Sequence, residues 1–367
     1  DADGCAMLLA VHVDAKTTPP EELLREAEAA CTPGSEDPRM KAARGEACAI
    51  VGHSYERGVG VGASEPRALV AYERGCQLGH DPSCRLNPPH ASGTPPSPMP
   101  HPLCPVVVIT GASRGLGLGL ACLLAAQRVP LVLTARSPLP LDSVARTLRA
   151  AGAVVQTRVA DAADDRAMSD AFDAASRLGP LGALVNNAGV LEPIGPVAEL
   201  DLHAFESALR TNVIGVLVGT RLALAHRSPD ATLRIVNVSS GAATHPYAGW
   251  AAYCSSKAAV SMLTRVTAVE NPDAIAVSVA PGIIETRMQR VIRSTPPARF
   301  PAVDRFVSLH ESGNLSHPLD AAVTLDWLAR SAPRSMSGEL VDALGDPMRA
   351  TLDAVRGAID SSKSVKY

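Results

Sequence analysis

Residues 106–117 read VVVITGASRGLG, and they predict the architecture of the sequence that follows them. Val106–Thr110 is an apolar, β-branched run of the kind that forms a buried strand. Gly111, Gly115 and Gly117 come next, and a helical pattern continues beyond them. Glycine lets the backbone turn tightly and approach a pyrophosphate, and the N-terminus of a following helix favours the anion. A strand, a glycine turn and a helix in this order predict the start of a dinucleotide-binding domain.

Further strands and helices alternate after this stretch. Val129–Ala135 predicts a second strand, Val154–Ala160 a third, and Leu184-Val185 leads a fourth. Because alternation of this kind is typical of a doubly wound parallel sheet, the expected fold class is α/β, a Rossmann fold. The aromatic content of 3% agrees, since a core of Ala, Val, Leu and Ile is more typical of helix-covered parallel sheets than of a β-sandwich.

The residue at the end of the second predicted strand indicates the cofactor. An acidic residue there would bind the ribose diol of NAD, whereas this chain has Arg136, which suits the 2′-phosphate of NADP. Arg114 in the glycine turn adds a second cation, and Ser137 is within reach. We therefore expect NADP, because the places of both arginines at strand ends favour this interpretation over two plain surface arginines.

Residues 239–257, SSGAATHPYAGWAAYCSSK, carry the predicted chemistry. Tyr253 and Lys257 lie four residues apart, so a helix brings them to one face. A neighbouring ammonium would lower the pKa of the phenol, which then exchanges a proton with a carbonyl or alcohol oxygen near neutral pH. Ser240 ends a predicted buried strand and offers a hydroxyl to the same oxygen. A bare YxxxK pattern is more often structural, but the motifs around it favour catalysis.

Many motifs in a fixed order resemble the short-chain dehydrogenase/reductase family, over about residues 105–348. They are TGASRGLG, Asp161, NNAG, Asn212 in LRTNVIG, Ser240, YCSSK and Pro281-Gly282. The resemblance implies a catalytic tetrad of Asn212, Ser240, Tyr253 and Lys257. It also implies that Asn212 holds a water that relays protons to the lysine.

The same resemblance implies a cofactor site. Asp161 would contact the adenine, residues 187–189 the adenosine side, and residues 281–286 the nicotinamide. The cofactor-binding residues implied in this way are Thr110, Gly111, Ser113, Arg114, Gly115, Leu116, Gly117, Arg136, Ser137, Asp161, Asn187, Ala188, Gly189, Tyr253, Lys257, Pro281, Gly282, Ile283 and Thr286. No metal-binding set is predicted.

Within the family, HPYAGWAAYCSSKAA and PGIIETRMQRVIR most resemble the sepiapterin reductase and benzil reductase branch. This implies NADPH-dependent reduction of a ketone or a vicinal dicarbonyl. Ser240 would hydrogen-bond the carbonyl oxygen, Tyr253 would donate the proton, and Lys257 would lower the pKa of the tyrosine and bind the nicotinamide ribose. The cofactor supplies the hydride chemistry, while the protein supplies placement and electrostatics. The alternatives are a catalytically idle scaffold and an NAD-linked alcohol dehydrogenase.

We expect residues 283–306 to form a lid over this site. The apolar residues that either line a pocket there or belong to the core, the core being favoured for each, are Trp250, Met288, Val291, Ile292, Phe300 and Phe306. In the sepiapterin branch a carboxylate near the chain end holds the pterin. This chain offers Asp342 or Asp346, and neither is clearly aligned.

Residues 1–86 have a different character, that of short helices joined by turns. The order of cysteines, glycines and tyrosines from Cys48 to Cys84, a span of 36 residues, resembles the Sel-like helical repeat. This implies either a protein-binding module or a passive fragment, since fewer than three repeats rarely form a stable solenoid. The resemblance also implies bridged cysteines, either Cys48 with Cys76 or Cys76 with Cys84. Residues 87–105, with eight prolines, predict a spacer before a reductase domain at residues 106–367.

Charge and apolar patterning exclude several partners. The net charge is −3 with both signs interspersed, which argues against nucleic acid and an anionic membrane surface. We expect no membrane span, because no apolar run in the sequence reaches the length needed to cross a bilayer. The chain begins at Asp1, so we expect it to be truncated or processed. We expect a cytoplasmic protein, because NADPH is an intracellular reductant, and the family resemblance implies a homodimer or homotetramer.

Overall fold

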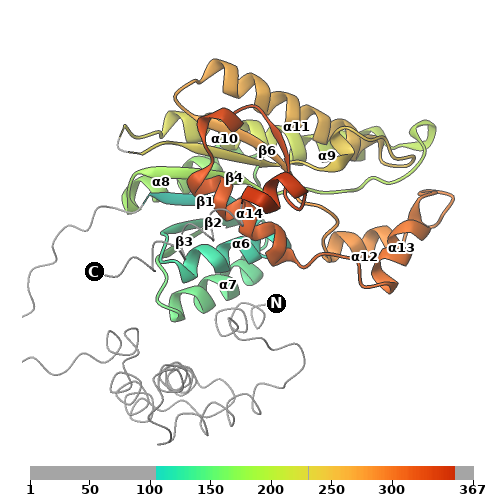
Figure 1. Ribbon diagram of the computed structural model, residues 1–367, viewed down its shortest axis with the longest axis horizontal. Coiled ribbons are helices and arrows are strands. Elements are labelled where there is room, and N and C mark those ends of the chain that lie inside the picture. Colours follow the sequence, from blue (N-terminus) through green and yellow to red (C-terminus); the bar gives the residue numbers. More distant parts are fainter. Residues whose placement is uncertain (1–104, 230, 352–367) are drawn as a thin grey trace, which may run out of the picture. The chain divides into compact units, whose positions relative to one another are not determined.

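The computed structural model describes residues 105–229 and 231–351. The predicted helical repeats of residues 1–86 and the linker, except Pro105, lie outside the described residues, so both stay predictions. The described part is an α/β domain in which helices cover both faces of a central sheet (Figure 1). The predicted Rossmann architecture is therefore confirmed for this part of the chain.

The sheet contains seven strands in the described residues, all parallel, in the order β3-β2-β1-β4-β5-β6-β7. Strand order reverses between β1 and β4, and the carboxyl ends of strands at such a point are where ligands bind in doubly wound sheets. The strands are β1 Val106–Thr110, β2 Leu131–Ala135, β3 Val155–Val159, β4 Leu181–Asn186, β5 Arg234–Val238, β6 Ile275–Ala280 and β7 Leu340–Asp342.

Helices α6, α7 and α14 pack on one face of the sheet, and α8, α10 and α11 on the other. The α-helices are α6 Gly115–Ala126, α7 Pro138–Ala150, α8 Asp165–Leu178, α9 Leu202–Leu209, α10 Gly215–Ala225, α11 Ala251–Glu270, α12 Arg287–Arg293, α13 Val303–Glu311 and α14 Pro318–Ser331. The shorter turns are the 3-10 helices η1 Val197–Glu199, η3 Gly241–Ala243 and η4 Arg334–Met336, and the π-helix η2 Arg210–Ile214.

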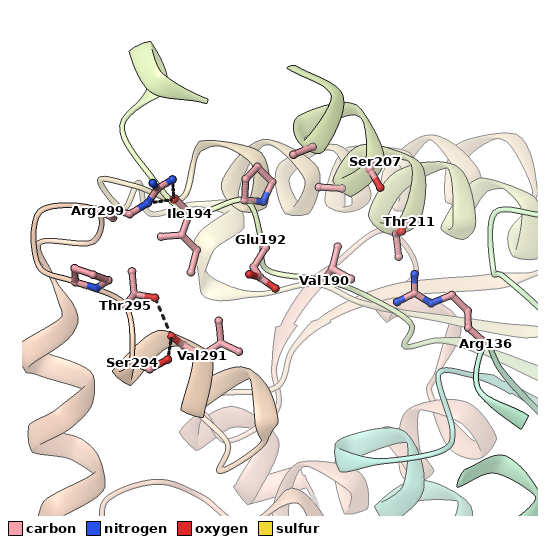
Figure 2. Close-up of a pocket in the computed structure, with 14 residues that line it drawn as sticks. Arg136, Val190, Glu192, Ile194, Ser207, Thr211, Val291, Ser294, Thr295 and Arg299 are labelled. Atoms are coloured by element: carbon pink, nitrogen blue, oxygen red, sulfur yellow. Dashed lines mark hydrogen bonds between the residues drawn. The ribbon is translucent and has the colours of Figure 1, made fainter. Parts of the chain in front are cut away.

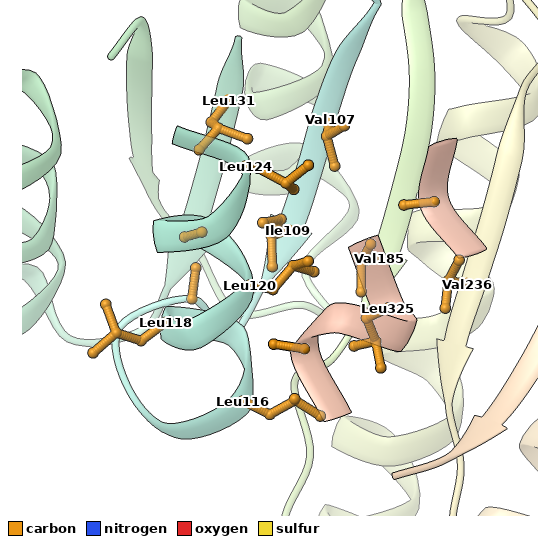
Figure 3. Packing of buried hydrophobic residues seen from close by; sticks show 14 of the residues in the cluster. Val107, Ile109, Leu116, Leu118, Leu120, Leu124, Leu131, Val185, Val236 and Leu325 are labelled. Carbon is orange, nitrogen blue, oxygen red and sulfur yellow. The ribbon is translucent and has the colours of Figure 1, made fainter. Parts of the chain in front are cut away.

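The uninterrupted apolar run of β1 follows from burial on both faces. Val107 and Ile109 point toward α6 and α14, while Val106 and Val108 point toward the α8 and α10 side. Successive side chains of a strand alternate between faces, so a strand covered by helices on both sides is apolar throughout. Figure 3 shows the first of these layers, in which leucines of α6 and Leu325 of α14 interdigitate above β1.

One helical run is longer and more apolar than the sequence analysis expected. Leu202–Ala225, which joins α9, η2 and α10, is by length and composition able to cross a membrane, with a mean hydropathy of 1.3. The most apolar stretch of this run is 50% buried, and α10 packs against β4 and α8. The apolar character of α10 is explained by this packing, because a helix that covers a sheet needs an apolar face.

The glycine turn is locked to the end of β4 by hydrogen bonds. Asn187 Nδ2 donates to the carbonyls of Thr110 (2.9 Å) and Gly111 (3.1 Å). A Cβ at Gly117 would lie 2.5 Å from that nitrogen and 2.7 Å from the Gly111 oxygen. Gly117 is therefore required for space rather than for backbone conformation.

Replacing Gly117 with alanine should destabilise the domain, although alanine is the better helix former. The new methyl group would displace the Asn187 amide, and overpacking of this kind costs about 1–3 kcal/mol. Gly241→Ala is the matched control, because a Cβ there meets nothing within 4 Å. Urea unfolding followed by circular dichroism measures both variants. Equal stability of the two variants would contradict the proposed role of Gly117.

Candidate active site

The predicted tetrad comes from three elements at the carboxyl edge of the sheet. Ser240 follows β5 and caps η3, where its Oγ accepts a hydrogen bond from the Ala242 amide at 3.1 Å. Tyr253 and Lys257 lie one turn apart in α11, with the lysine Nζ 5.6 Å from the tyrosine ring centroid. Both are buried, and a hydrogen bond joins Tyr253 to Ser240. The structure thus brings the serine, the tyrosine and the lysine together.

The tyrosine differs electrostatically from the sequence expectation. Burial raises the pKa of Tyr253, and the hydrogen bond with Ser240 only partly opposes this. The expected lowering of the tyrosine pKa by the lysine ammonium was therefore wrong for this structure, because desolvation of the buried phenolate is the largest influence on this pKa. A tyrosine with a raised pKa remains protonated at neutral pH, which is the form that donates a proton.

Lys257 is held inside the domain by a hydrogen bond to a backbone carbonyl of β5. Its Nζ donates to the Val238 carbonyl at 2.8 Å, and only 4% of the residue is exposed. Burial lowers the pKa of Lys257 to about 8, since removing water disfavours the ammonium. The charge of this lysine is thus sensitive to pH in a range where an ordinary lysine remains charged.

Asn212 closes the site from the π-helix η2. Its Oδ1 accepts a hydrogen bond from the Val190 amide, and its Nδ2 donates to the Val190 carbonyl, both at 2.8 Å. The same Nδ2 donates to Ser256 Oγ at 3.0 Å. A Cβ at Gly189 would lie 3.4 Å from Asn212 Oδ1 and 3.6 Å from Lys257 Nζ. These contacts show that Asn212 fastens the loop after β4 beside the lysine.

The residues expected around the cofactor converge from distant parts of the chain. Thr110 Oγ1 accepts hydrogen bonds from the amides of Asn187 (3.0 Å) and Ala188 (3.1 Å), which joins the glycine turn to the NNAG segment. Thr286 Cγ2 lies 3.6 Å from the position of a Cβ on Gly115, which brings the predicted nicotinamide segment to the turn. Asn187 uses both amide hydrogens within the protein, so its side chain braces the turn.

The other predicted cofactor residues lie along the same edge. Asp161, half-buried after β3, accepts a hydrogen bond from the Ala163 amide at 2.9 Å. Ser137 caps α7, and Gly282 has a positive φ of 83° at the end of β6. Arg136 is exposed at the end of β2. The remaining members lie in the glycine turn, the first turn of α6 and the loops after β4 and β6: Ser113, Leu116, Ala188, Pro281 and Ile283.

This arrangement fits a dinucleotide. The N-terminus of α6 has no side-chain cap and no acidic residue in its first turn. Its backbone N–H groups therefore suit a pyrophosphate. Gly115 has a positive φ of 55°, and only the Thr286 methyl lies near its Cβ position, which leaves room for a close approach. Arg114 at the N-cap and Arg136 supply positive charge on either side.

The expected lid consists of α12 and α13 around one carboxylate. Glu285 accepts two hydrogen bonds from Arg293 (2.9 and 3.0 Å) and lies 3.1 Å from His310 Nδ1. The hydrogen bonds from Arg293, with its charge and that of His310, lower the pKa of Glu285. The backbone bridge between Ile284 and Ser316 fastens the base of the same segment. Glu285, near the start of the expected lid, thus contacts one side chain of α12 and one of α13 and joins the two helices.

The apolar residues of the lid form a core beside Tyr253. Trp250 stacks on Phe300 with ring centroids 4.6 Å apart, and it meets Tyr253 edge-on at 5.6 Å. The predicted core residues that are buried in this cluster are Trp250, Ile292, Phe300 and Phe306. The core interpretation is confirmed for these four. Met288 is partly buried against them, and Val291 lines a pocket.

A pocket of about 630 Å³ lies between α12, α9 and the loop after β4 (Figure 2). Arg136 lies at one end of it. Its wall includes Val190, which is hydrogen-bonded to Asn212, and Thr211, which precedes Asn212 in the sequence. The tetrad itself is not part of the lining. The pocket therefore adjoins the tetrad through Asn212 and reaches the arginine expected to bind the cofactor.

Three residues of this pocket were not predicted from the sequence: Glu192, Ile194 and Arg299. Arg299 donates two hydrogen bonds, from Nε (2.9 Å) and Nη2 (2.8 Å), to the Ile194 carbonyl. A Cβ on Gly195 would lie 2.9 Å from Arg299 Nη2, and one on Gly249 would lie 2.2 Å from the Arg299 carbonyl. The two glycines were the available signal in the sequence, because both lie where a side chain would meet Arg299. Nothing in the sequence, however, connects either glycine with an arginine so far along the chain.

A parallel sheet with a glycine turn, a tyrosine and lysine on one helix, and a serine beside them defines a Rossmann-fold oxidoreductase. The family model described as short chain dehydrogenase matches residues 105–297, more than half of the chain. The chain therefore belongs to the short-chain dehydrogenase family.

Several relatives cover almost the whole reductase part. An uncharacterized oxidoreductase of Schizosaccharomyces pombe is 33% identical over 241 residues, which are 65% of this chain and 95% of that protein. Benzil reductase ((S)-benzoin forming) of Saccharomyces cerevisiae is 35% identical over 249 residues, with coverages of 64% and 94%. Sepiapterin reductase of Xenopus tropicalis is 36% identical over 254 residues, with the same coverages of 64% and 94%.

A solved structure supports the fold. The short-chain dehydrogenase/reductase from Saccharomyces cerevisiae superposes with a TM-score of 0.63 at 28% identity, covering 67% of this chain and 98% of that one. The expected resemblance to benzil and sepiapterin reductases is thus confirmed as similarity, in an oxidoreductase of this family.

The lowered pKa of Lys257 predicts how reduction depends on pH. Tyr253, whose pKa is raised, stays protonated across this range, whereas Lys257 loses its charge as the pH rises through about 8. The carbonyl reduction expected from the sequence should therefore have a rate that is level below this pH and falls above it. NADPH oxidation measured from pH 6 to 10 tests this. Lys257→Arg keeps its charge, so its residual rate should not fall near pH 8. A wild-type rate that is level up to pH 9.5 would refute the prediction.

Proposed function

We propose that the protein is an NADPH-dependent carbonyl reductase that acts on a ketone or a vicinal dicarbonyl. The observation that carries this proposal is the buried Tyr253, hydrogen-bonded to Ser240 and kept protonated beside Lys257. A protonated phenol next to a second hydroxyl donor is suited to a carbonyl oxygen that gains negative charge during reduction. An idle scaffold has no physical need for this constellation.

The protein's own groups have distinct parts in this reaction. The bound cofactor supplies the hydride. Ser240 and Tyr253 donate hydrogen bonds to the carbonyl oxygen, and Tyr253 then gives up its proton. Lys257, positioned by the Val238 carbonyl, would hold the nicotinamide ribose of the bound cofactor and would stabilise the resulting phenolate. Asn212 holds the wall of the site by its two hydrogen bonds with Val190. We propose that it also orders a water beside the lysine.

NADP is the proposed cofactor because of the charge at the end of β2. Arg136 is exposed there, and the structure gives it no hydrogen-bonding or ionic partner among the described residues. A guanidinium recognises phosphate oxygens with planar, paired hydrogen bonds. An acidic residue, which NAD requires for its ribose diol, is missing at this position. This difference disfavours the alternative of NAD-linked alcohol oxidation.

Aromatic packing favours a carbonyl substrate with aryl or other flat apolar groups. In a chain with only 3% aromatic residues, Trp250 contacts Tyr253 edge-on and packs with Tyr247, Phe300 and Phe306 in one cluster. Relatives named benzil reductase agree with this substrate class. The end of β7 gives less support for a pterin, since Asp342 is exposed and accepts a hydrogen bond from Leu344 within its own turn.

We further propose a cytoplasmic homodimer or homotetramer that assembles through α10 and α11. Both helices expose apolar side chains, and those exposed by 40% or more are Ile214 just before α10, Leu217, Met262, Val266 and Val269. Surfaces of this kind favour contact with a second chain. The cytoplasm is proposed because it supplies NADPH.

Wild-type protein should oxidise NADPH when given benzil or 1-phenyl-1,2-propanedione. Tyr253→Phe removes the proton donor and should lower kcat about 10³-fold, within the usual range for a general acid, while NADPH still binds. A pterin ketone is assayed alongside the diketones. Tyr247→Phe, which removes another phenol of the same aromatic cluster, is the matched control and should retain most activity. NADPH binding without turnover of any carbonyl would favour the scaffold instead.

A further inference from the structure

The pocket beside the tetrad carries one carboxylate that the proposed mechanism does not use. Glu192 is exposed, and within residues 105–229 and 231–351 it has no hydrogen bond or ion pair. Figure 2 shows its carboxylate directed into the space between the loop after β4 and α12. Among the residues that line this pocket, only Glu192, Arg136 and Arg299 are ionisable. The acidic group in the pocket is therefore Glu192.

The loop that carries Glu192 is anchored on both sides. On one side, Val190 exchanges two hydrogen bonds with Asn212. On the other side, the Ile194 carbonyl accepts two hydrogen bonds from Arg299, and the Gly195 amide donates to the Gly249 carbonyl at 2.9 Å. Two fixed points so close in sequence leave the backbone of the three residues between them a defined position. Glu192 is thus attached at a fixed place in the pocket wall.

The two arginines do not neutralise this carboxylate. Arg299 directs its guanidinium to the Ile194 backbone and forms no ion pair with Glu192. Arg136 lies at the other end of the pocket, where the proposed cofactor would occupy it with a 2′-phosphate. A substrate that enters after the cofactor therefore meets one carboxylate without a partner, Glu192, and one guanidinium, Arg299, whose hydrogen bonds go to the Ile194 carbonyl. Within one pocket, a carboxylate attracts a positively charged group of a ligand and repels a negatively charged group, even near water.

We propose that Glu192 is a specificity-determining residue, which disfavours carbonyl substrates that bear a carboxylate and favours neutral substrates and those that bear an ammonium group. This inference rests on the proposed carbonyl reduction and adds a charge rule to it. Ser207 and Thr211, also in the lining, offer hydroxyl groups elsewhere on the pocket wall for the N–H of such a substrate. Ser240 and Tyr253 would bind the reacting carbonyl, while Glu192 would interact with the charge at the distal end of the substrate.

Three matched substrates test the rule: 1-phenyl-1,2-propanedione, its 4-carboxylate and its 4-aminomethyl derivative. We expect wild-type kcat/KM to be about 10-fold lower for the carboxylate than for the neutral compound, and highest for the ammonium compound, as charge interactions near a surface allow. Glu192→Gln should bring the three values close together, and Glu192→Lys should reverse their order. Added salt should weaken the wild-type preference.

Glu199→Gln is the matched control, because Glu199 is an exposed glutamate of η1 that does not line the pocket. It should retain the wild-type order of the three substrates. An unchanged ratio of carboxylate to neutral kcat/KM in Glu192→Gln would overturn the proposal. An equal change in Glu199→Gln would also overturn it, because the effect would then come from overall charge.

Binding separates this inference from the proposed function. Isothermal titration of the three alcohol products into the NADP-loaded protein gives their Kd without any turnover. The same order of charge preference, lost in Glu192→Gln, would support the role of Glu192 even if reduction fails with all three diketones. Equal Kd values for the three alcohols in the wild type would refute the role of Glu192 even if reduction succeeds.

Discussion

The hydrogen bonds between Thr110 and the segment of Asn187 and Ala188 are the constraint on which the rest of the site depends. They fasten the end of β1 to the end of β4, at the point where the strand order reverses. The glycine turn is shaped by this contact, since neither Gly111 nor Gly117 has space for a side chain beside the NNAG segment. The N-terminus of α6 is thereby left open for an anion.

The same segment leads directly into the catalytic group. Gly189 lies over Asn212 and Lys257, and Val190 is paired with the Asn212 amide. The π-helix η2, which contains Asn212, interrupts the helical run of α9 and α10, and such interruptions are frequent at functional sites. Burial then sets the protonation of the site, because it raises the pKa of Tyr253 and lowers that of Lys257. Burial of Tyr253, rather than the charge of a neighbouring lysine, keeps the phenol protonated and therefore able to donate a proton.

Sequence patterns predicted the sheet and the tetrad because each rests on local spacing. VVVIT needs burial on both faces, and a tyrosine and lysine four apart need one helix. The raised pKa of Tyr253 was not predictable, since it depends on how completely distant segments cover the ring. The pocket wall was missed for a similar reason: Arg299 reaches Ile194 across 105 residues of sequence. Whether the lid residues were pocket or core was decided only by three-dimensional packing, as Trp250 on Phe300 shows.

The central claim is that this edge of the sheet holds NADPH for carbonyl reduction, with Arg136 on the 2′-phosphate. The most direct measurement is the ratio of kcat/KM for NADPH to that for NADH, at a fixed concentration of diketone, in wild type and in Arg136→Asp. The account predicts a strong wild-type preference for NADPH that is lost or reversed in the variant. A wild-type preference for NADH, or a ratio that the substitution leaves unchanged, would contradict it.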